Sequence, residues 1–593
     1  MQRTKCLSAL CWASVLSLGL VTPALAQDDD DGPGPTIVNK GGVEVDLRSF
    51  GRMVADDVIR HGNVLLTSDA TPVASPQVGS QIQTRGGNVQ VNDPGLDNIQ
   101  IFPGFRPFVE FTQSETSIAA NGRNIVATYN TSAFQPLMHV PGGLVFTHRF
   151  LSGYSFSGDG GKTWTSSQMP PVPGSIFTFG DPSIASDRNG NFYFSGLGAD
   201  ATGLFTIQVN RSDDGGRTFG PAVVVQQDNG GDKEWIAVGK DPGVPGRDNV
   251  YVTWTSFQTD GSAQLRLGKS IDGAASFTTK TIFAPPTDPD PTHPQNSLTF
   301  SNPVVDSITG RLYVPFIQFS NSDTDYIRVL ASDDAGETFS FLTFNVPGAP
   351  LTTVLPVVQS GELLDCGNGG IRLAIHAGAP LAGRFGLRQF VQTSRLVTQP
   401  AFAARNGVLY LAWSNSTSSI FGDPSSGSNV LFIRSDDGGA TWTAPIQVNP
   451  SNTLDHHHVL PALAIGASPT SVHVAFYTQH TDGSVDVDLA NSHDRGNSFP
   501  VDRTVRVTSS PFVLPPTVLR LTALATPTTN YDRTIQPAYS LGEYLSVTAA
   551  NGSVYALWGD ARNTVTEPVN PLSPLSGKTH TQQDVFFQEI KAQ

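Results

Sequence analysis

The chain has 593 residues, of which 51 are Asp or Glu and 36 are Lys or Arg, so its formal net charge is −15. An acidic average field disfavours polyanions, which excludes nucleic acid and anionic membrane surfaces as general partners and leaves cations or neutral glycans. The length is ample for a large hydrophobic core.

Residues 1–26 predict an export signal. Arg3 and Lys5 precede a mostly apolar stretch from Cys6 to Val21, and Ala24-Leu25-Ala26 forms a small-residue cleavage site. The apolar stretch is too short for a membrane span and no later segment is long enough, so we expect no membrane insertion. The pattern indicates a secreted or periplasmic protein, which we also expect to be a monomer.

The rest of the chain divides into two parts. Residues 27–84 form an acidic, partly disordered segment, and residues 85–593 contain repeats that an insertion at about 350–398 interrupts. Because Cys6 and Cys11 would leave with the signal, Cys366 would stand alone and could form no intrachain disulfide.

One octapeptide, S-x-D-x-[GA]-x-[ST]-[WF], recurs six times. A short Asp side chain accepts backbone N–H groups within a tight turn, glycine allows positive φ, and the closing Trp or Phe supplies area to bury. We therefore interpret these aspartates as turn-stabilising rather than catalytic. The six copies are Ser157–Trp164, Ser212–Phe219, Ser270–Phe277, Ser332–Phe339, Ser435–Trp442 and Ser492–Phe499.

The octapeptide resembles the Asp box of sialidases and other BNR-repeat proteins, and the resemblance covers nearly all of the chain from about residue 88. It implies an all-β fold, a β-propeller of four-stranded antiparallel blades. A second repeat, strand–turn–strand, agrees with this, because its short apolar runs suit inner strands that are buried on both faces. It occurs seven times, at Thr116–Asn130, Asp181–Leu197, Glu234–Trp254, Asn302–Gln318, Gln399–Trp413, Leu460–Tyr477 and Glu543–Trp558.

The seventh hairpin is followed by one further strand, Asp584–Ile590, so an outer strand is missing there. Asn88–Asn92 (NVQVN) resembles the strand after the fifth octapeptide, Ile446–Asn449 (IQVN). We therefore predict that the N-terminal strand completes the last blade and closes a ring of seven. Six blades is the alternative, if the first or last hairpin is an appendage.

The resemblance places the chemistry around the central channel, on the face where the chain enters each first strand. The catalytic candidates on this face are Asp181, Asp232, Glu234, Glu543, Tyr544 and Arg562. Carboxylates at a channel mouth could bind calcium or act as an acid/base pair on a sugar. The competing interpretation is that they cap strand ends and hydrogen-bond loops.

A histidine-rich stretch is the candidate metal site. Asp455, His456 and His458 could bind a transition metal, although neighbouring side chains on a strand point to opposite faces.

Sialidase chemistry itself fits poorly. The resemblance implies a glutamate-activated tyrosine, an aspartate acid/base and three arginines that bind the substrate carboxylate. Glu543, Tyr544 and Arg562 fit part of this pattern, but the family's Arg-Ile-Pro motif is absent. The other candidate arginines fall in turns that we expect on the opposite face: Arg123, Arg188, Arg247, Arg311 and Arg405.

The leading hypothesis is a secreted glycan-interacting propeller, a glycoside hydrolase of unknown substrate. Asp181, Asp232 or Glu543 would be the acid, and a second carboxylate or Tyr544 the base or nucleophile. Two alternatives stay open, a non-catalytic binding or scaffold propeller and a polysaccharide lyase. A deep pocket with two carboxyl groups about 5–10 Å apart would indicate catalysis, and a plugged channel would favour the scaffold.

Overall fold

The computed structural model describes residues 37–40, 43–46, 87–97, 113–131, 137–140, 143–146, 149–285, 297–319, 325–342, 358–360, 374–375, 399–417, 427–451, 455–513, 521–522, 534–535, 539–566 and 579–591. Over these ranges the protein is all-β, with two short 3₁₀ turns, η1 (Pro94–Asp97) and η2 (Val501–Arg503), and no α-helix. None of the described segments is a helix with the length and apolarity to cross a membrane. The predicted signal and Cys366 lie outside the described residues.

Antiparallel units of four strands follow one another along the chain. Unit 1 contains β4 (Gln113–Asn121), β5 (Asn124–Thr131), β9 (Ser152–Ser157) and β10 (Thr165–Gln168). Unit 2 contains β11 (Phe177–Ser186), β12 (Phe192–Ala199), β13 (Phe205–Ser212) and β14 (Val223–Gln227), with β8 (Arg149–Phe150) parallel to β11. Unit 3 contains β15 (Gly231–Lys240), β16 (Asp248–Phe257), β17 (Ala263–Ser270) and β18 (Thr278–Phe283).

In unit 4, β19 (Ser297–Thr299) and β20 (Val304–Val305) both pair with β21 (Leu312–Phe319), and β22 (Asp325–Ser332) and β23 (Ser340–Leu342) follow. Unit 5 contains β26 (Ala401–Arg405), β27 (Val408–Ser416), β28 (Ser428–Ser435) and β29 (Ile446–Gln447). Unit 6 contains β30 (Asp455–Ile465), β31 (Val472–His480), β32 (Val485–Ser492) and β33 (Thr504–Arg506). Unit 7 contains β37 (Ser546–Ala550), β38 (Ser553–Thr566), β39 (Thr579–Lys591) and β3 (Val89–Gln90).

Short pairs of strands accompany these units. In the N-terminal segment, β1 (Ile37–Lys40) pairs with β2 (Val43–Asp46). From the predicted insertion, β24 (Val358–Ser360) joins β22, and β25 (Ala374–Ile375) pairs with β36 (Tyr539–Ser540). The others are β6 (Leu137–Val140) with β7 (Gly143–Phe146), and β34 (Leu521–Thr522) with β35 (Thr534–Ile535).

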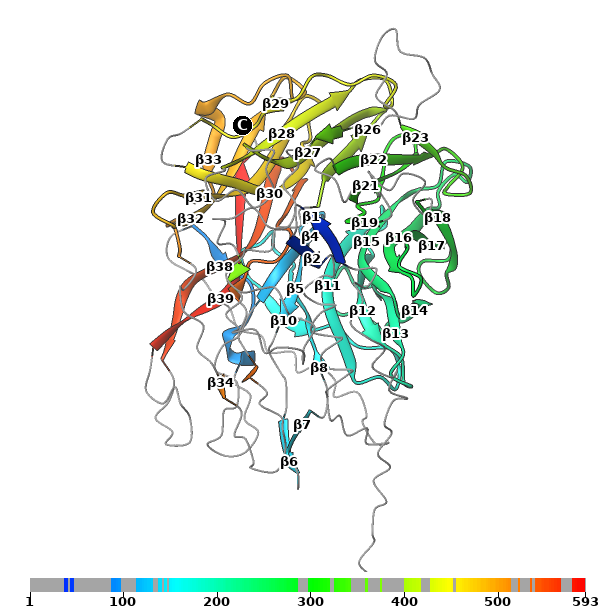
Figure 1. The fold of residues 1–593 in the computed structure, drawn as a ribbon, viewed down its shortest axis with the longest axis vertical. Helices are drawn as coiled ribbons and strands as arrows, with labels where there is room; N and C mark the ends of the chain where they lie inside the picture. Colours follow the sequence, from blue (N-terminus) through cyan, green and yellow to red (C-terminus); the bar gives the residue numbers. More distant parts are fainter. Residues whose placement is uncertain are drawn as a thin grey trace, which may run out of the picture.

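The first strands of successive units contact one another in chain order, β4 to β11 to β15 to β20 to β26 to β30 to β37, and β37 contacts β4 again. In Figure 1 the sheets accordingly succeed each other around the molecule from cyan through green and yellow to red. A repeated hydrogen bond ties these strands together. The N–H of Ile184 donates to Ser117 Oγ and the N–H of Ile236 to Ser183 Oγ, each at 3.2 Å. Between the last and first units, the N–H of Ile118 donates to Ser546 Oγ at 2.9 Å.

Hydrophobic side chains fill the spaces between neighbouring units. Each space holds a cluster of buried apolar residues from the two sheets that face it, including the space between unit 7 and unit 1. In that space Trp164 of the first octapeptide meets Phe587 of β39, with ring centroids 5.1 Å apart. No unit could bury both its faces alone, so the packing of neighbours supplies the core.

The octapeptides form tight turns, as predicted. In the first copy, Ser157 Oγ and Thr163 Oγ1 both donate to the Asp159 carboxylate at 2.8 Å, and the N–H of Thr163 donates to it at 3.0 Å. The equivalent side-chain bonds recur at Asp214, Asp272, Asp334, Asp437 and Asp494. The two residues after each Asp have positive φ, whether glycine or not. These aspartates therefore stabilise turns.

The predicted N-terminal strand pairs with the last strand. In register, Val89 lies opposite Phe587 and Gln90 opposite Phe586, both antiparallel. Asn92 adds side-chain bonds, because its Nδ2 donates to Asp584 Oδ1 at 2.7 Å and its Oδ1 accepts from the N–H of Val585 at 2.8 Å. β3 thus occupies the position beside β39 that the C-terminal hairpin leaves vacant.

Candidate functional site

The same irregularity interrupts five of the first strands. In four of them a non-glycine residue with φ between 52° and 58° lies where pairing with the second strand slips, and in unit 4 such a residue lies in the break between β19 and β20. Left-handed backbone is unfavourable for such residues and is found preferentially at functional sites. The five residues are Glu115, Asp181, Lys233, Phe300 and Leu460. Three of them are charged, and these three lie together.

Lys233 is the centre of this group. Its Nζ lies 3.7 Å from Glu115 Oε1 and 3.7 Å from Asp181 Oδ2, and it forms a still closer ion pair with Glu543 Oε2. All four side chains are at most 4% exposed. The cluster therefore joins the first strands of units 1, 2 and 3 to the segment before β37. Such a burial of charge is expensive unless the groups compensate one another.

The electrostatics favour a charged lysine. Burial alone would lower the pKa of Lys233, but the carboxylates of Asp181, Glu115 and Glu543 outweigh burial and raise it. Burial raises the pKa of Glu115, and the nearby lysine opposes that shift. Asn130 supports Glu115, because its Nδ2 donates to Glu115 Oε2 at 2.7 Å.

On the side of unit 7, the backbone at Gly542 packs closely against Glu115. Gly542 has a φ of +86°, and a Cβ at this position would lie 2.2 Å from Glu115 Cγ. Only glycine fits there, since both the conformation and the space exclude a side chain. Glycine thus lets the chain that carries Glu543 reach the lysine.

Glu234 is the acid that the lysine does not bind. Its side chain is buried, and neither carboxyl oxygen has a hydrogen-bond partner among the described residues. Burial, followed by the negative charge of Asp181, raises the pKa of Glu234 well above its ordinary value. The raised pKa favours the protonated form of Glu234, which is the form that a general acid needs.

Glu234 lines a small void that is too narrow to admit a sphere of water size. The lining residues are Asp181, Lys233, Glu234, Trp235, Phe300, Ser301, Gln399 and Tyr544. Trp235 and Tyr544 meet edge to face, with ring centroids 4.8 Å apart. Trp235 is the one lining residue that is not buried.

The surroundings of Tyr544 disfavour its ionised, nucleophilic form. Its hydroxyl donates to the carbonyl of Pro182 at 3.2 Å, and burial together with the carboxylates around it raises its pKa well above the ordinary value. A deprotonated Tyr544 is disfavoured in this arrangement, because the phenolate would add a further negative charge to the cluster.

Four of the six predicted catalytic residues share this region: Asp181 and Glu543 as ion-pair partners of Lys233, and Glu234 and Tyr544 in the lining of the void. Asp232 lies one residue before Lys233 and is also buried, and its Oδ1 accepts the N–H of Lys233 at 2.9 Å. Lys233 itself is not among the residues predicted from the sequence. The signal that finds it is alignment of the hairpins on Ile118, Ile184 and Ile236, which puts Lys233 in register with Glu115 and Asp181.

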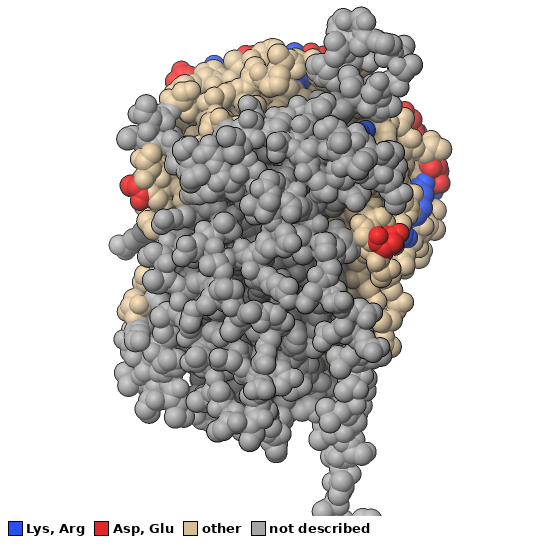
Figure 2. Space-filling view, viewed as in Figure 1, with Lys and Arg blue, Asp and Glu red and all other residues tan. Residues whose placement is uncertain are grey.

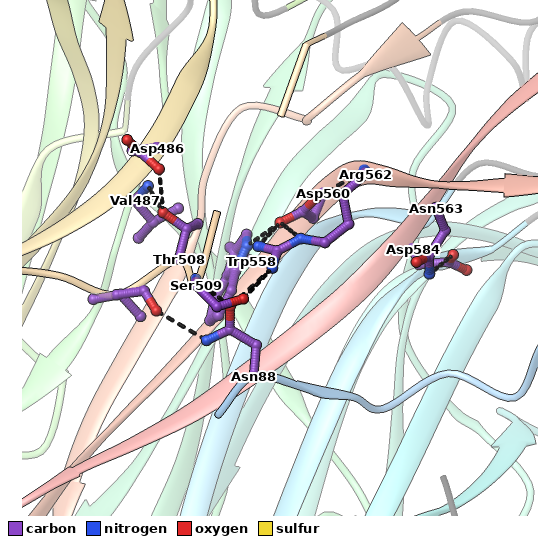
Figure 3. A network of polar contacts seen from close by, with 12 residues as sticks. Asn88, Asp486, Val487, Thr508, Ser509, Trp558, Asp560, Arg562, Asn563 and Asp584 are labelled. Atoms are coloured by element: carbon purple, nitrogen blue, oxygen red, sulfur yellow. Dashed lines mark hydrogen bonds and ion pairs between the residues drawn. The ribbon is translucent and has the colours of Figure 1, made fainter. Parts of the chain in front are cut away.

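Arg562 lies elsewhere. Its guanidinium binds the Asp560 carboxylate, with Nε at 2.9 Å from Oδ2, and its Nη1 donates to Asn88 Oδ1 at 3.0 Å and to Ser509 Oγ at 2.7 Å. Figure 3 shows these side chains pointing toward one another from β38, the N-terminal strand region and the chain after β33. Arg562 thus connects segments of units 6 and 7, with Asp560 as its acidic partner.

The histidine-rich stretch begins β30. His458 is buried with its Nδ1 3.2 Å from Thr478 Oγ1, while the side chains of Asp455 and His456 lie outside the described residues. In the part of the chain that the structure describes, no three His, Cys, Asp or Glu side chains are arranged to hold a metal ion. The metal site that includes Asp455 and His456 stays a prediction, as does calcium.

Two of the arginines between first and second strands lie by octapeptide turns. Arg123 Nη2 donates to the carbonyl of Asp159, and Arg311 Nη1 donates to that of Gly438, each at 3.3 Å. Figure 2 shows the charged atoms of the described residues in small mixed groups along the periphery of this face. Among the residues that line the void, Lys233 is the only basic one, so no arginine triad is present there.

No family model and no curated protein matches this chain. Among solved structures, it is similar to a protein of unknown function from Dyadobacter fermentans, with 11% identity over 71% of this chain and 96% of the other and a TM-score of 0.37. It is also similar to the Hadza microbial sialidase Hz136, with 12% identity over 87% of this chain and 96% of the other and a TM-score of 0.35. A Trypanosoma rangeli sialidase is similar with 12% identity over 81% of this chain and 55% of the other, and with a TM-score of 0.33. The likeness therefore spans about half of that enzyme.

Proposed function

We propose that the seven four-stranded units are the blades of a closed β-propeller. Three observations support the ring. The first strands contact one another in chain order and return to the start, apolar clusters fill the spaces between units, and β3 pairs with β39. The hydrogen bond from Ile118 to Ser546 repeats between units 7 and 1 the bond that links units 1 and 2. On this proposal the Lys233 cluster lies at the central channel.

We propose that this propeller acts on carbohydrate as a glycoside hydrolase, with Glu234 as the general acid. Either Glu543 or Asp181, whose negative charge Lys233 stabilises, would be the base or nucleophile. The single observation that carries the proposal is the contrast between these carboxyl groups. One is buried without a partner and favours its neutral form, and the others are paired with an ammonium. Glycosidic bond cleavage requires one acid and one carboxylate in such a division of roles.

The location of the protein belongs to the same proposal. Residues 1–26 would direct export, residues 27–84 would precede the propeller, and residues 85–593 would form it, with the insertion at about 350–398. The mature chain would then meet glycans outside the cytoplasm.

A buried charge cluster is a poor way to stabilise a channel. Apolar side chains of similar volume would fill the space without the desolvation of five acidic groups and a lysine, and they would need no left-handed residues. Sequences depart from the most stable choice chiefly at functional sites. The departure is concentrated here, at Glu115, Asp181, Lys233 and Glu234.

One observation favours a second candidate, the non-catalytic binding or scaffold propeller. The void beside Glu234 admits no sphere of water size, so a sugar could enter only if lining side chains moved. On that alternative the cluster would hold the first strands together, and glycans or proteins would bind elsewhere on the ring.

Hydrolysis of a panel of fluorogenic glycosides, sialosides included, separates the two candidates. The enzyme proposal expects turnover of at least one glycoside, reduced by at least about 10²-fold in Glu234→Gln. Glu337→Gln is the matched control, because Glu337 is 65% exposed and pairs with Lys269 on the surface. Turnover that survives in Glu234→Gln would remove Glu234 from the mechanism. A folded protein that cleaves nothing in the panel would favour the scaffold.

A further inference from the structure

We infer that the channel site selects a ligand with a positively charged amino group. This inference rests on the carbohydrate-directed function proposed above. The substrates would then be glycans with free amines rather than neutral or acidic sugars. The site contains more acidic groups than basic ones. Glu115, Asp181 and Glu543 surround one ammonium, and Asp232 and Glu234 flank that lysine in sequence. Lys233 is the only cation that lines the void, so acidic groups outnumber the positive charge available to them.

Lys233 shows how this site binds an amine. Its ammonium lies among three carboxylates, 5.3 Å from the centre of the Phe300 ring and 5.5 Å from that of the Tyr544 ring. Carboxylates and aromatic faces together are the groups that bind ammonium ions in proteins. The walls of the void are therefore already matched to a primary amine.

Glu234 provides the unused acceptor. Both of its carboxyl oxygens are buried and lack hydrogen-bond partners among the described residues, and its side chain lines the void beside Trp235. An incoming ammonium would donate a hydrogen bond to Glu234, and the negative charges of Glu115, Asp181 and Glu543 would favour it whether or not Glu234 keeps its proton. A neutral hydroxyl could satisfy the oxygens but would bring no charge, and a carboxylate would be repelled.

Trp235 lies where we expect a ligand to enter the void. It is the lining residue that is not buried, and its ring contacts Tyr544 edge to face. Entry of a sugar requires the indole to move away from Tyr544, after which the ring could stack on the apolar face of the sugar. Binding should therefore change the fluorescence of Trp235.

The test is a glycan array on which each hexosamine-containing oligosaccharide is printed twice, as the free amine and as the N-acetyl form, beside neutral and sialylated oligosaccharides. The full chain should bind free-amine glycans at least about ten-fold more tightly than their N-acetyl partners. An acidic protein could attract cationic glycans through its general field, and such attraction weakens steeply with salt. Binding is therefore measured at low and at 0.5 M salt.

Glu234→Gln separates the site from the general field, because it changes the total charge by at most one unit. The amine preference should disappear in Glu234→Gln and persist in Glu337→Gln, and each variant's unfolding midpoint verifies its fold. A preference that survives in Glu234→Gln, or equal binding of N-acetyl forms, overturns the inference and leaves the glycan-directed function standing. If no glycan binds in any form, the proposed function fails as well.

Discussion

Lys233 and Glu543 form a buried ion pair between β15 and the segment that leads into β37, with side chains 4% and 2% exposed. The pair joins unit 3 to unit 7 across the first strands of the units between them. Two more carboxylates share the same ammonium, so one lysine compensates several acidic groups that otherwise lie in a dry interior. The stability of the centre and its chemistry therefore depend on the same residue.

Replacing Lys233 by Met should destabilise the fold by about 3–5 kcal/mol at neutral pH, because it leaves the carboxylates buried without a cation. The carboxyl groups of the variant would then have folded-state pKa values above their unfolded ones. The loss should be largest at neutral pH and shrink as the pH falls toward about 4, because the unfolded chain then begins to take up the protons that the folded variant already holds. Denaturant unfolding at pH 7 and pH 4.5 measures this.

Lys280→Met is the control for that experiment. Lys280 is 37% exposed and lies 3.8 Å from an exposed Glu337, so its removal should change stability by less than about 1 kcal/mol at either pH. Equal effects of the two substitutions would mean that the Lys233 cluster is solvated.

Arg562→Met should also destabilise the fold by about 3–5 kcal/mol, since Asp560 is fully buried and would lose its cation. The network in Figure 3 would lose its link from β38 to Asn88 and Ser509. Arg506→Met is the comparison, because Arg506 is 51% exposed and 3.9 Å from Asp486. Chemical denaturation of both variants gives the difference, and a stable Arg562→Met would show that this network contributes little.

Short-range patterns were enough to predict the units of the fold. Each octapeptide contains the Ser, Asp and Thr or Ser side chains that hydrogen-bond within its own turn, as at Asp159, and each hairpin has its own short apolar runs. The pairing of β3 with β39 was also predictable, because Asn88–Asn92 resembles the strand that follows the fifth octapeptide. Segments without a repeat, such as 27–84 and 350–398, offered no such pattern.

The site was predictable in part. The prediction placed Asp181, Glu234 and Glu543 just before first strands. Asp181 and Glu234 instead lie within β11 and β15, and topology brings all three together. Lys233 was missed because a lysine in sequence normally indicates solvent, and only the positions of carboxylates on other units make its burial favourable. For Arg562 the position was read as a channel residue, but Asp560, two residues away, holds it at the contact between units 6 and 7.

Acid should weaken the turn between β15 and β16. Burial would raise the pKa of Asp241, but hydrogen bonds from Arg247, Asn249 and the N–H groups of Gly243 and Val244 outweigh burial and lower it to about 2. A folded-state pKa below the unfolded one contributes stability that is present above about pH 5 and lost as the pH falls toward 2.

Asp241→Asn tests that expectation. The variant should be less stable than the parent at pH 7, and its stability should fall less steeply between pH 5 and pH 2. Thermal unfolding across this range measures both quantities. Parallel curves for the two proteins would mean that Asp241 titrates normally in the folded state.

The first octapeptide turn tests the contact between units 1 and 7. Gly160 and Gly161 are neighbours with φ values of +83° and +89°, but a Cβ at Gly160 meets nothing within 4 Å, whereas one at Gly161 would lie 2.4 Å from Phe587 Cε1. Gly160→Ala should therefore cost only the backbone strain, about 1–2 kcal/mol. Gly161→Ala should cost a further 1–3 kcal/mol or so, because Phe587 is packed between the two units and must move. Denaturant unfolding of the two variants isolates this difference. Equal losses would contradict the packing of unit 1 against β39, and with it the closed ring, since that contact is where the ends of the repeat meet.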